Sequence, residues 1–188
     1  MCLKTIWNFL WKSNSILSWI VDIILIFLLV KFVLFPLASF VLATPLPFVI
    51  IESKSMEHEG NLDSWFALHG AWYLEHNITK QEIKDYWPWK NGLDKGDVII
   101  IRGLKKGDYK KGDVIVFKIP SQKTPIIHRI VSVNNANEGE TIFSTKGDHN
   151  DGQLPYEQEI HKEQIVGKAI AQIPKIGWVK LFFVELFR

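Results

Sequence analysis

Serine and histidine side chains carry the chemistry that this sequence could support. Ser53 and Ser55 follow directly on the apolar, β-branched run at residues 48–51. A serine hydroxyl is a weak nucleophile unless a neighbouring base removes its proton during attack, and the pKa of histidine suits that task near neutral pH. The histidine in turn needs a partner that fixes its orientation. These requirements direct attention to a histidine held in a rigid element.

His128 has the surroundings that best fit such a base. It lies in the apolar run IIHRIV, where a strand would hold the imidazole rigidly. On pattern alone, an ordinary strand histidine fits this position equally well. The other histidines lie in a segment with helical signals or in loops, at His58, His69, His76, His149 and His161.

One long apolar segment precedes the serines. Between Ile16 and Ile51 the only charged residues are Asp22 and Lys31. We expect a single membrane-spanning helix at about residues 17–40, because about 20 apolar residues cross the hydrocarbon core of a bilayer. Lys31 costs about 2.5–3.5 kcal/mol near the middle of such a helix, but its long side chain can reach towards an interface. A buried helix of a soluble protein is the alternative.

The flanking charges indicate an orientation. Lys4 and Lys12 precede the apolar segment, and the positive-inside rule then places the N-terminus in the cytoplasm and the residues beyond about 45 outside it. We expect a single-pass protein of the cell membrane, or of the endoplasmic-reticulum membrane in a eukaryote, with its catalytic domain on the extracytoplasmic side.

The remainder of the chain is predicted to be mainly β, with one α-helical insertion. Residues 57–94 carry helix signals, since Asp63 could cap one helix, and Thr79 with Glu82 forms a capping-box pattern before a second helix that Pro88 would stop. From residue 97 onward, short β-branched runs alternate with Gly, Asp and Asn turns. The predicted strands are VIII, VIVFKI, IIHRIVSV, TIFSTK and IVGKAIAQI.

These patterns divide the chain into three parts. Residues 1–44 form the anchor segment, and residues 45–174 form a catalytic β domain that includes the insertion at 57–94. Residues 175–188 are apolar and amphipathic but too short to cross a bilayer, so we expect them to lie on the membrane surface.

Composition narrows the possible partners and cofactors. The 22 Lys and Arg residues nearly balance 20 Asp and Glu residues, so charge gives no reason to expect nucleic acid as a partner. Cys2 is the only cysteine, which excludes an internal disulfide framework and a Cys-rich metal site. The sequence contains no His-Glu-x-x-His pattern, phosphate loop or dinucleotide fingerprint, so no metal or organic cofactor is implied.

Four short motifs stand in a fixed order behind the apolar segment. They are Ser53-Lys54-Ser55-Met56, Gly112-Asp113-Val114-Ile115-Val116-Phe117, His128-Arg129 and Thr145-Lys146-Gly147-Asp148-His149-Asn150. Together they resemble the signal peptidase I family. The resemblance implies a signal-peptidase-like β domain and a membrane-bound serine endopeptidase that cuts signal peptides from exported preproteins after small residues. The histidine before Arg129 is typical of the archaeal and endoplasmic-reticulum branch of that family, in which the base is histidine instead of lysine.

The resemblance also implies roles for individual residues. Ser55 would attack the scissile carbonyl, and His128 would act as general base. Ser53 would help form the oxyanion hole together with the backbone N–H of Ser55. Asp148 matches the family's aspartate and would orient His128. Asp151 is the alternative, because the family usually has a further aspartate several residues after the Gly-Asp pair, whereas here only two residues intervene.

Two departures from the family pattern concern the insertion. His58 stands where the family often has proline, and the next Gly-Asp pair, Gly96-Asp97, comes some forty residues after Ser55. Residues 57–94 are therefore an insertion relative to the family. Its role is left open between a cap on the cleft, a membrane contact, a partner contact and a tolerated surface elaboration.

The expected substrates are signal-peptide-bearing preproteins in extended form at the bilayer surface, with secretion-machinery proteins as possible partners. The strand before Ser55 and residues 113–119 would flank the peptide by β-augmentation, and Val49, Ile51 and Val114 would line its side-chain pockets. Two alternatives remain: a processing protease of the same fold with one dedicated substrate, and a catalytically inactive, membrane-tethered β-rich binding module.

Overall fold

The computed structural model describes residues 7–8, 11–13, 15–103, 108–135 and 141–186. Contacts divide the chain into two compact units, Met1–Val41 and Leu42–Arg188. The first unit contains the predicted apolar helix, and the second contains the β domain, the insertion and the C-terminal helix.

The first unit contains a continuous helix that is long and apolar enough to cross a membrane, from Ile16 to Val41. The Ser15 side chain begins it by accepting a hydrogen bond from the Ser18 N–H at 3.1 Å. Near its middle one turn is π-helical. Pro36 lies just beyond this turn, and a proline removes one helical N–H donor and crowds the carbonyl four residues earlier. The successive segments are α2 (Ile16–Leu29), the π turn η1 (Val30–Leu34) and α3 (Phe35–Val41).

Lys31 lies within the π turn of this helix. Its ammonium group lies 5.7 Å from the ring centroid of Phe27 and 5.4 Å from that of Phe32. The two ring faces are an attractive environment for a cation, so they reduce the cost of one charge in an otherwise apolar helix.

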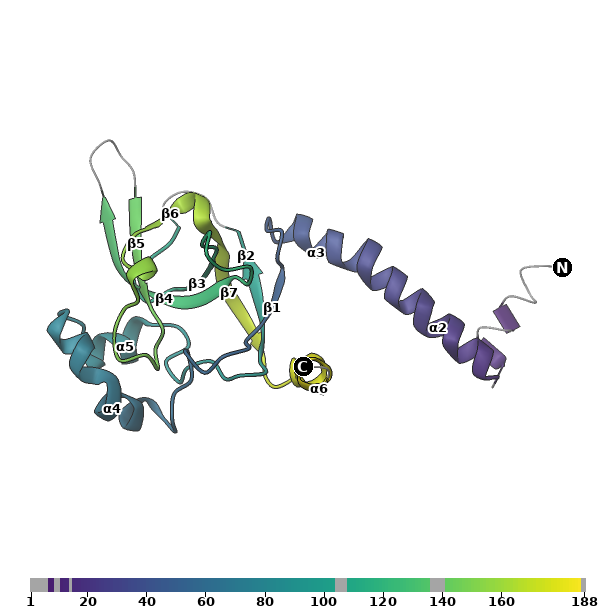
Figure 1. Cartoon of the computed structure of the whole chain (residues 1–188), viewed down its shortest axis with the longest axis horizontal. Coiled ribbons are helices and arrows are strands. Elements are labelled where there is room, and N and C mark those ends of the chain that lie inside the picture. Colours follow the sequence, from purple (N-terminus) through teal and green to yellow (C-terminus); the bar gives the residue numbers. More distant parts are fainter. Residues whose placement is uncertain (1–6, 9–10, 14, 104–107, 136–140, 187–188) are drawn as a thin grey trace. The chain divides into compact units, whose positions relative to one another are not determined.

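The second unit is built on a seven-stranded antiparallel sheet in the order β1-β2-β7-β3-β4-β5-β6 (Figure 1). This curled sheet confirms the predicted mainly β, signal-peptidase-like fold. All five β runs predicted after residue 97 form strands, and the short run before Ser55 forms the edge strand β1. The strands are β1 (Phe48–Ile50), β2 (Val98–Arg102), β3 (Val114–Phe117), β4 (Ile126–Asn135), β5 (Thr141–Lys146), β6 (Ile160–His161) and β7 (Ile165–Ile173).

Strand β3 lies at the centre of the core. All four of its side chains are fully buried, because alternate residues of a strand point to opposite faces of the sheet and both faces of this strand are covered. Val114 and Val116 pack in one apolar cluster with Ile51 and Met56. Ile115 and Phe117 pack in a second cluster, on the other face, with Ile130, Phe143 and other residues of the surrounding strands.

The insertion forms two helices, α4 (Leu62–Glu75) and α5 (Lys80–Tyr86). The first helix is capped by Asn61, whose side chain accepts from the N–H groups of the second and third residues of the helix; the predicted cap, Asp63, lies inside the first turn. Asp63 instead accepts a hydrogen bond from Lys80 at 2.8 Å. Thr79 caps the second helix as predicted, and its side chain accepts from the Glu82 N–H at 3.1 Å.

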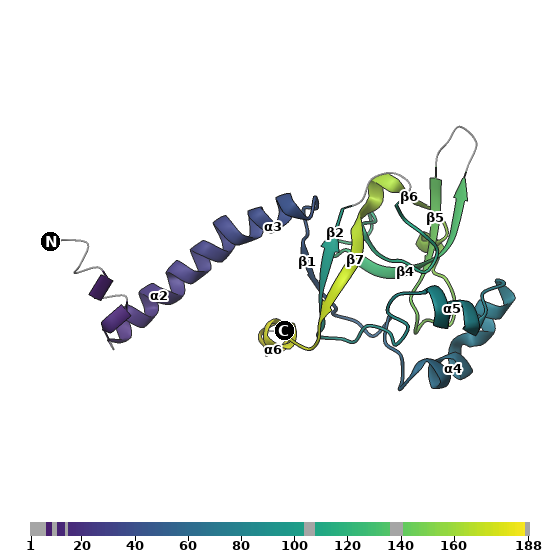
Figure 2. The same ribbon diagram turned by 180° about the vertical axis from the view of Figure 1, so that it is seen from behind.

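The C-terminal helix α6 (Trp178–Leu186) is attached to the β domain at its first turn. The N–H of Gly177 donates to the carbonyl of Gly96 at 2.8 Å, and Leu181 is buried. Figures 1 and 2 show α4 and α5 near the β4–β5 side of the sheet and α6 near the β1–β7 side. The exposed apolar side chains of α6 include Val179, Phe182, Phe183, Val184 and Leu186.

Candidate active site

Ser55 is held in a tight turn five residues after the end of β1. The N–H of Glu57 donates to the carbonyl of Lys54 at 3.0 Å and closes the turn. Met56 is fully buried, and its carbonyl accepts from the N–H of Leu93 at 2.8 Å. Because Met56 fixes the turn in the core, the neighbouring Ser55 side chain is presented at the surface of the domain.

Strand β4 brings His128 to this serine. His128 is paired with Ile115 in the middle of the sheet, and the whole residue is 4% exposed. Its Nε2 atom lies 3.0 Å from Oγ of Ser55. That separation is a hydrogen bond, across which an imidazole can take the proton of an attacking hydroxyl.

Glu157 occupies the other side of the imidazole. Its Oε1 atom lies 2.5 Å from Nδ1 of His128, and the residue is fully buried. It ends the 3₁₀ turn η3 (Pro155–Glu157), where Oε2 accepts from the N–H of Leu154 at 2.7 Å. Ser55, His128 and Glu157 therefore form one line of hydrogen bonds.

This arrangement corrects the carboxylate chosen from the sequence. Neither Asp148 nor Asp151 is the partner of His128 in the described structure. The Asp148 carboxylate accepts three hydrogen bonds from the guanidinium group of Arg129, at 2.6, 2.9 and 3.1 Å. Asp151 is exposed on the surface of the loop.

The physical reason lies in the geometry of the loop. The Gly147-Asp148 pair turns its carboxylate inwards beneath the loop, towards a buried guanidinium group, so it cannot also face the imidazole. Pro155 pre-sets the backbone for a 3₁₀ turn, and this turn brings the longer glutamate side chain back to β4. The motifs in the sequence point only to aspartates in or close to the Gly-Asp pair, so Glu157 was not predicted. The proline two residues before it was the available signal.

A buried ion pair supports the site from below. The guanidinium group of Arg129 also donates hydrogen bonds to the carbonyls of Pro88, Trp89 and Gly112, at 2.6, 3.0 and 2.9 Å. Burial raises the pKa of Asp148, but the charge of Arg129 and hydrogen bonds from Arg129 and His58 outweigh it, so the pKa is lowered well below the ordinary value. The carboxylate is therefore ionised in the folded protein.

We expect Asp148→Ala to lower the free energy of unfolding by about 3–5 kcal/mol, because it leaves the Arg129 guanidinium group buried without its counter-charge. Chemical denaturation of the full chain in detergent micelles measures this loss. Asp151→Ala is the matched control in the same loop, and as an exposed substitution it should change stability by less than about 0.5 kcal/mol. Equal losses in the two variants would contradict the buried ion pair.

The same carboxylate sets a pH dependence of stability. Its pKa is lower in the folded state than in the unfolded state, where aspartate titrates at about 3.9. Its stabilising contribution is therefore complete above about pH 4 and is lost as the pH falls towards the lower, folded-state pKa. Asp148→Ala should remove this part of the acid sensitivity, which denaturation series at decreasing pH would show.

A cleft of about 520 Å³ opens beside Ser55 and His128. One wall is the edge strand β1, whose Val49 is among the lining residues, and the facing wall is the segment 122–127. The other two predicted pocket residues, Ile51 and Val114, lie in the core. The predicted flanking segment 113–119 also differs, because strand β3 within it is paired on both sides, with β4 and β7.

Polar side chains surround the reacting end of this cleft. Oγ of Ser53 lies 3.1 Å from Oγ of Ser55, and both residues line the cleft. Glu52 and Lys180 also line it and form an exposed ion pair at 3.0 Å. Ser53 is thus beside Ser55, where a hydroxyl could donate to an oxyanion.

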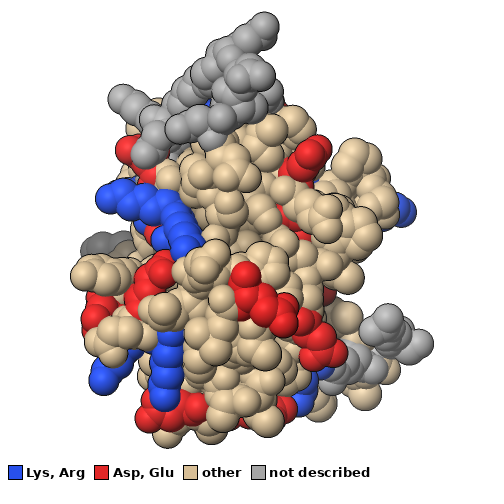
Figure 3. All heavy atoms as spheres, turned by 90° about the vertical axis from the view of Figure 1, so that its left-hand side faces the viewer, with Lys and Arg blue, Asp and Glu red and all other residues tan. Residues whose placement is uncertain are grey.

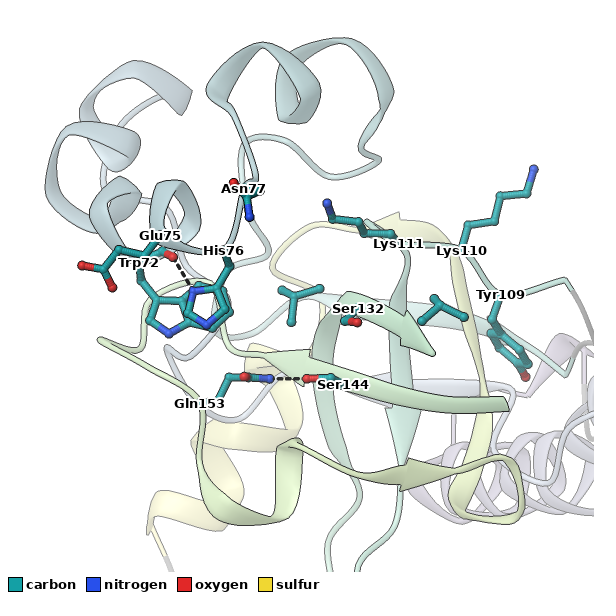
Figure 4. A pocket seen from close by; sticks show the side chains of 12 residues that line it. Trp72, Glu75, His76, Asn77, Tyr109, Lys110, Lys111, Ser132, Ser144 and Gln153 are labelled. Carbon is teal, nitrogen blue, oxygen red and sulfur yellow. Dashed lines mark hydrogen bonds between the residues drawn. The ribbon is translucent and has the colours of Figure 1, made fainter. Parts of the chain in front are cut away.

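A larger hollow lies elsewhere on the domain. Its volume is about 660 Å³, and it opens between the end of α4 and the strands β4 and β5 (Figure 4). The stacked rings of Trp72 and His76 form one of its walls. Neither Ser55 nor His128 lines it, so the smaller cleft is the better candidate for the reacting site.

In the part of the chain that the structure describes, neither the charged surface side chains nor the possible metal-ligating side chains indicate a second type of site. On the face drawn in Figure 3, Lys and Arg side chains are interspersed with Asp and Glu. Among the described residues, no group of three or more His, Cys, Asp or Glu side chains is placed to hold a metal ion.

Comparison with known proteins identifies relatives, although no protein-family model matches the chain. Signal peptidase complex catalytic subunit SEC11C of Homo sapiens is 29% identical over 92 residues, which cover 46% of this chain and 48% of that protein. The sec11 subunit of Dictyostelium discoideum is 28% identical over 92 residues, covering 46% and 51%. The putative subunit SEC11B of Homo sapiens is 31% identical over 88 residues, covering 44% and 53%. The chain spans about half the length of the curated relatives it matches.

The fold and the site define a β-sheet protein in which a serine, a histidine and a carboxylate are joined by consecutive hydrogen bonds. An apolar helix that is compatible with membrane anchoring precedes the β domain in the chain. The chain is homologous to the catalytic subunits of the signal peptidase complex, which confirms the resemblance to the signal peptidase I family.

Proposed function

We propose that this protein is a membrane-bound serine endopeptidase that removes signal peptides from exported preproteins after small residues. The observation that carries the proposal is the hydrogen-bonded line Ser55–His128–Glu157, with separations of 3.0 and 2.5 Å. It lies in a domain homologous to subunits that are named catalytic in the signal peptidase complex.

The geometry supports acyl-enzyme catalysis. Oγ of Ser55 attacks the scissile carbonyl carbon while Nε2 of His128 takes the hydroxyl proton. His128 then gives that proton to the leaving amine as the peptide C–N bond breaks, and water, activated by the same imidazole, releases the acyl group. Glu157 accepts the Nδ1–H and stabilises the imidazolium as it forms. Ser53 and the Ser55 N–H are the proposed donors to the oxyanion.

The cleft suggests how the substrate binds. Strand β1 is at the edge of the sheet and pairs only with β2 among the described strands, and an edge strand is where an extended peptide can add to a sheet by β-augmentation. Val49 lines the cleft beside it. A peptide bound along β1 would run towards Ser55, which lies five residues beyond the end of that strand.

The two apolar helices support a position at the membrane. Only the short segment 42–54 separates Ser55 in sequence from the helix that ends at Val41, and we propose that this short tether keeps the nucleophile close to the bilayer. We propose that the exposed apolar side chains of α6 rest on the membrane surface and that the β domain is extracytoplasmic. Confinement of enzyme and signal peptide to one surface raises their effective concentration. Because its relatives are subunits of the signal peptidase complex, we propose that this protein also works together with partner subunits.

A test with several leader peptides separates this function from the two alternatives. The purified full chain, in liposomes, is expected to cleave many membrane-inserted preproteins, each after a small residue, with cut sites read by mass spectrometry. Cleavage of a single preprotein would favour a dedicated processing protease. No cleavage of any member of the panel would favour an inactive binding module.

A further inference from the structure

The loop at residues 146–150 lies against both groups proposed to react. The N–H of His149 donates to the carbonyl of Ser55 at 2.8 Å. A Cβ atom at Gly147 would lie 2.9 Å from Nε2 of His128, so the loop backbone passes directly beside the imidazole. Any displacement of this loop would therefore change the alignment of Ser55 with His128.

Helix α4 and the residues just before it supply hydrogen bonds to the middle of this loop. Nε1 of Trp65 donates to the carbonyl of Asp148 at 3.1 Å, and the Tyr73 hydroxyl donates to Oδ1 of the same residue at 3.2 Å. Nε2 of His58 lies 2.9 Å from Oδ2, and its ring stacks on that of Trp65 with centroids 4.0 Å apart. Three side chains of the insertion thus hold one residue of the loop.

The start of the loop is held by the same helix. The ammonium group of Lys146 lies 4.7 Å from the ring centroid of Tyr73 and 5.3 Å from that of Trp72. It also donates to the carbonyl of Asn150 at 2.6 Å, which closes the loop on itself. Burial lowers the pKa of Lys146 to about 8, whereas the ring faces and the carbonyl favour the charged form.

The donors on α4 are themselves fixed in place. Trp65 and Tyr73 are fully buried and belong to an apolar cluster that includes Ile83 and Trp87 of the insertion and Val131 of β4. A side chain locked by packing holds its hydrogen-bond partner more firmly than one on a mobile surface. The insertion is therefore a rigid support for the loop.

We propose that α4 is a positioning element of the active site, in which Trp65 and Tyr73 hold the loop 146–150 and thereby keep Ser55 aligned with His128. This inference rests on the proposed function, and it gives the insertion a role other than a tolerated surface elaboration. Neither residue touches the cleft, so both act through the loop.

The test compares Tyr73→Phe with the matched control Tyr86→Phe, whose ring is 80% exposed on α5. Tyr73→Phe removes one donor to a buried carboxylate and keeps the ring beneath Lys146. With the full chain in liposomes and a preprotein substrate, we expect kcat to fall about tenfold and KM to stay within about twofold. The control should match the wild type in both constants.

A second measurement does not depend on activity. The N–H of His149 in the loop donates a hydrogen bond to the carbonyl of Ser55. The rate of hydrogen exchange at this N–H reports local opening of that contact. Exchange at His149 should be about tenfold faster in Tyr73→Phe and in Trp65→Phe, and unchanged in Tyr86→Phe, with thermal melts showing that each variant is folded.

The outcomes separate this inference from the function on which it rests. Cleavage by the wild type but not by Ser55→Ala supports the proposed function by itself. Given that result, wild-type kcat and wild-type exchange in both α4 variants would overturn the positioning role. A lower melting temperature with unchanged kcat would also overturn it, because it would show a purely structural contribution. If the wild type cleaves nothing, the proposed function fails, and unchanged exchange at His149 would show separately that α4 does not hold the loop.

Discussion

Ser55→Ala is expected to lower kcat for preprotein cleavage by a factor on the order of 10⁴–10⁶, because Ser55 carries the hydroxyl that is hydrogen-bonded to the proposed base, Nε2 of His128, at 3.0 Å. His128→Ala should cause a loss of similar size, since the nucleophile and its base act as a unit and their effects are not additive. Single-turnover cleavage of a liposome-inserted preprotein measures the rate of each variant and of the double variant.

The control for this prediction is Ser132→Ala. Ser132 lies on β4, four residues after the base, and its hydroxyl bonds only the Asn134 side chain, at 3.1 Å, among its described contacts. We expect wild-type kcat from this variant. Full processing by Ser55→Ala would end the proposed mechanism, because catalysis would then need another nucleophile.

The strands of the β domain could be predicted because β-branched runs and turn residues mark them locally. The run at residues 114–117 was predicted to be a strand, and its unbroken apolar character agrees with its burial on both faces. The exception is β6, whose two residues, Ile160 and His161, are too few to show a period. It forms because β5 offers a free edge, at Ile142 and Phe143, and that partner is not visible in the local sequence.

The serine and the histidine could be proposed because they lie in recognisable motifs, and the structure brings their side chains together at 3.0 Å. The carboxylate could not be chosen in the same way. Whether Asp148 faces an imidazole or a guanidinium group depends on how the loop turns, and Arg129 competes for it with a stronger, multiply bonded ion pair. The position of Asp148 in the motif does not reveal that Arg129 and His128 compete for its carboxylate.

The insertion shows the same limit of local patterns. Its helices could be predicted from local signals such as the capping-box pattern of Thr79 and Glu82, but the function of its aromatic side chains depends on long-range contacts. Trp65 and Tyr73 are hydrogen-bonded to a residue more than seventy positions later in the chain. A helix rich in aromatic residues looks like a surface elaboration until the loop that it supports is placed beside it.

Glu157→Gln is expected to lower kcat by a factor of about 10³–10⁴, with little change in KM. The Leu154 N–H at 2.7 Å requires an oxygen acceptor at the Oε2 position, so the amide oxygen of a glutamine would turn there and its NH₂ group would face Nδ1 of His128. An NH₂ group donates, and Nδ1 would then have to accept. The imidazole would carry its proton on Nε2 and could no longer take one from Ser55.

Glu159→Gln is the matched control, because it removes the same charge from an exposed side chain two residues away, and we expect it to keep wild-type kcat. Steady-state cleavage across pH 5–9 distinguishes the two roles of Glu157, since a wrong tautomer lowers the rate at every pH, whereas a lost charge alone would mainly shift the limb set by the histidine. Wild-type activity in Glu157→Gln, together with loss of activity in a stably folded Asp148→Asn variant, would return the orienting role to the aspartate that the family motif indicates.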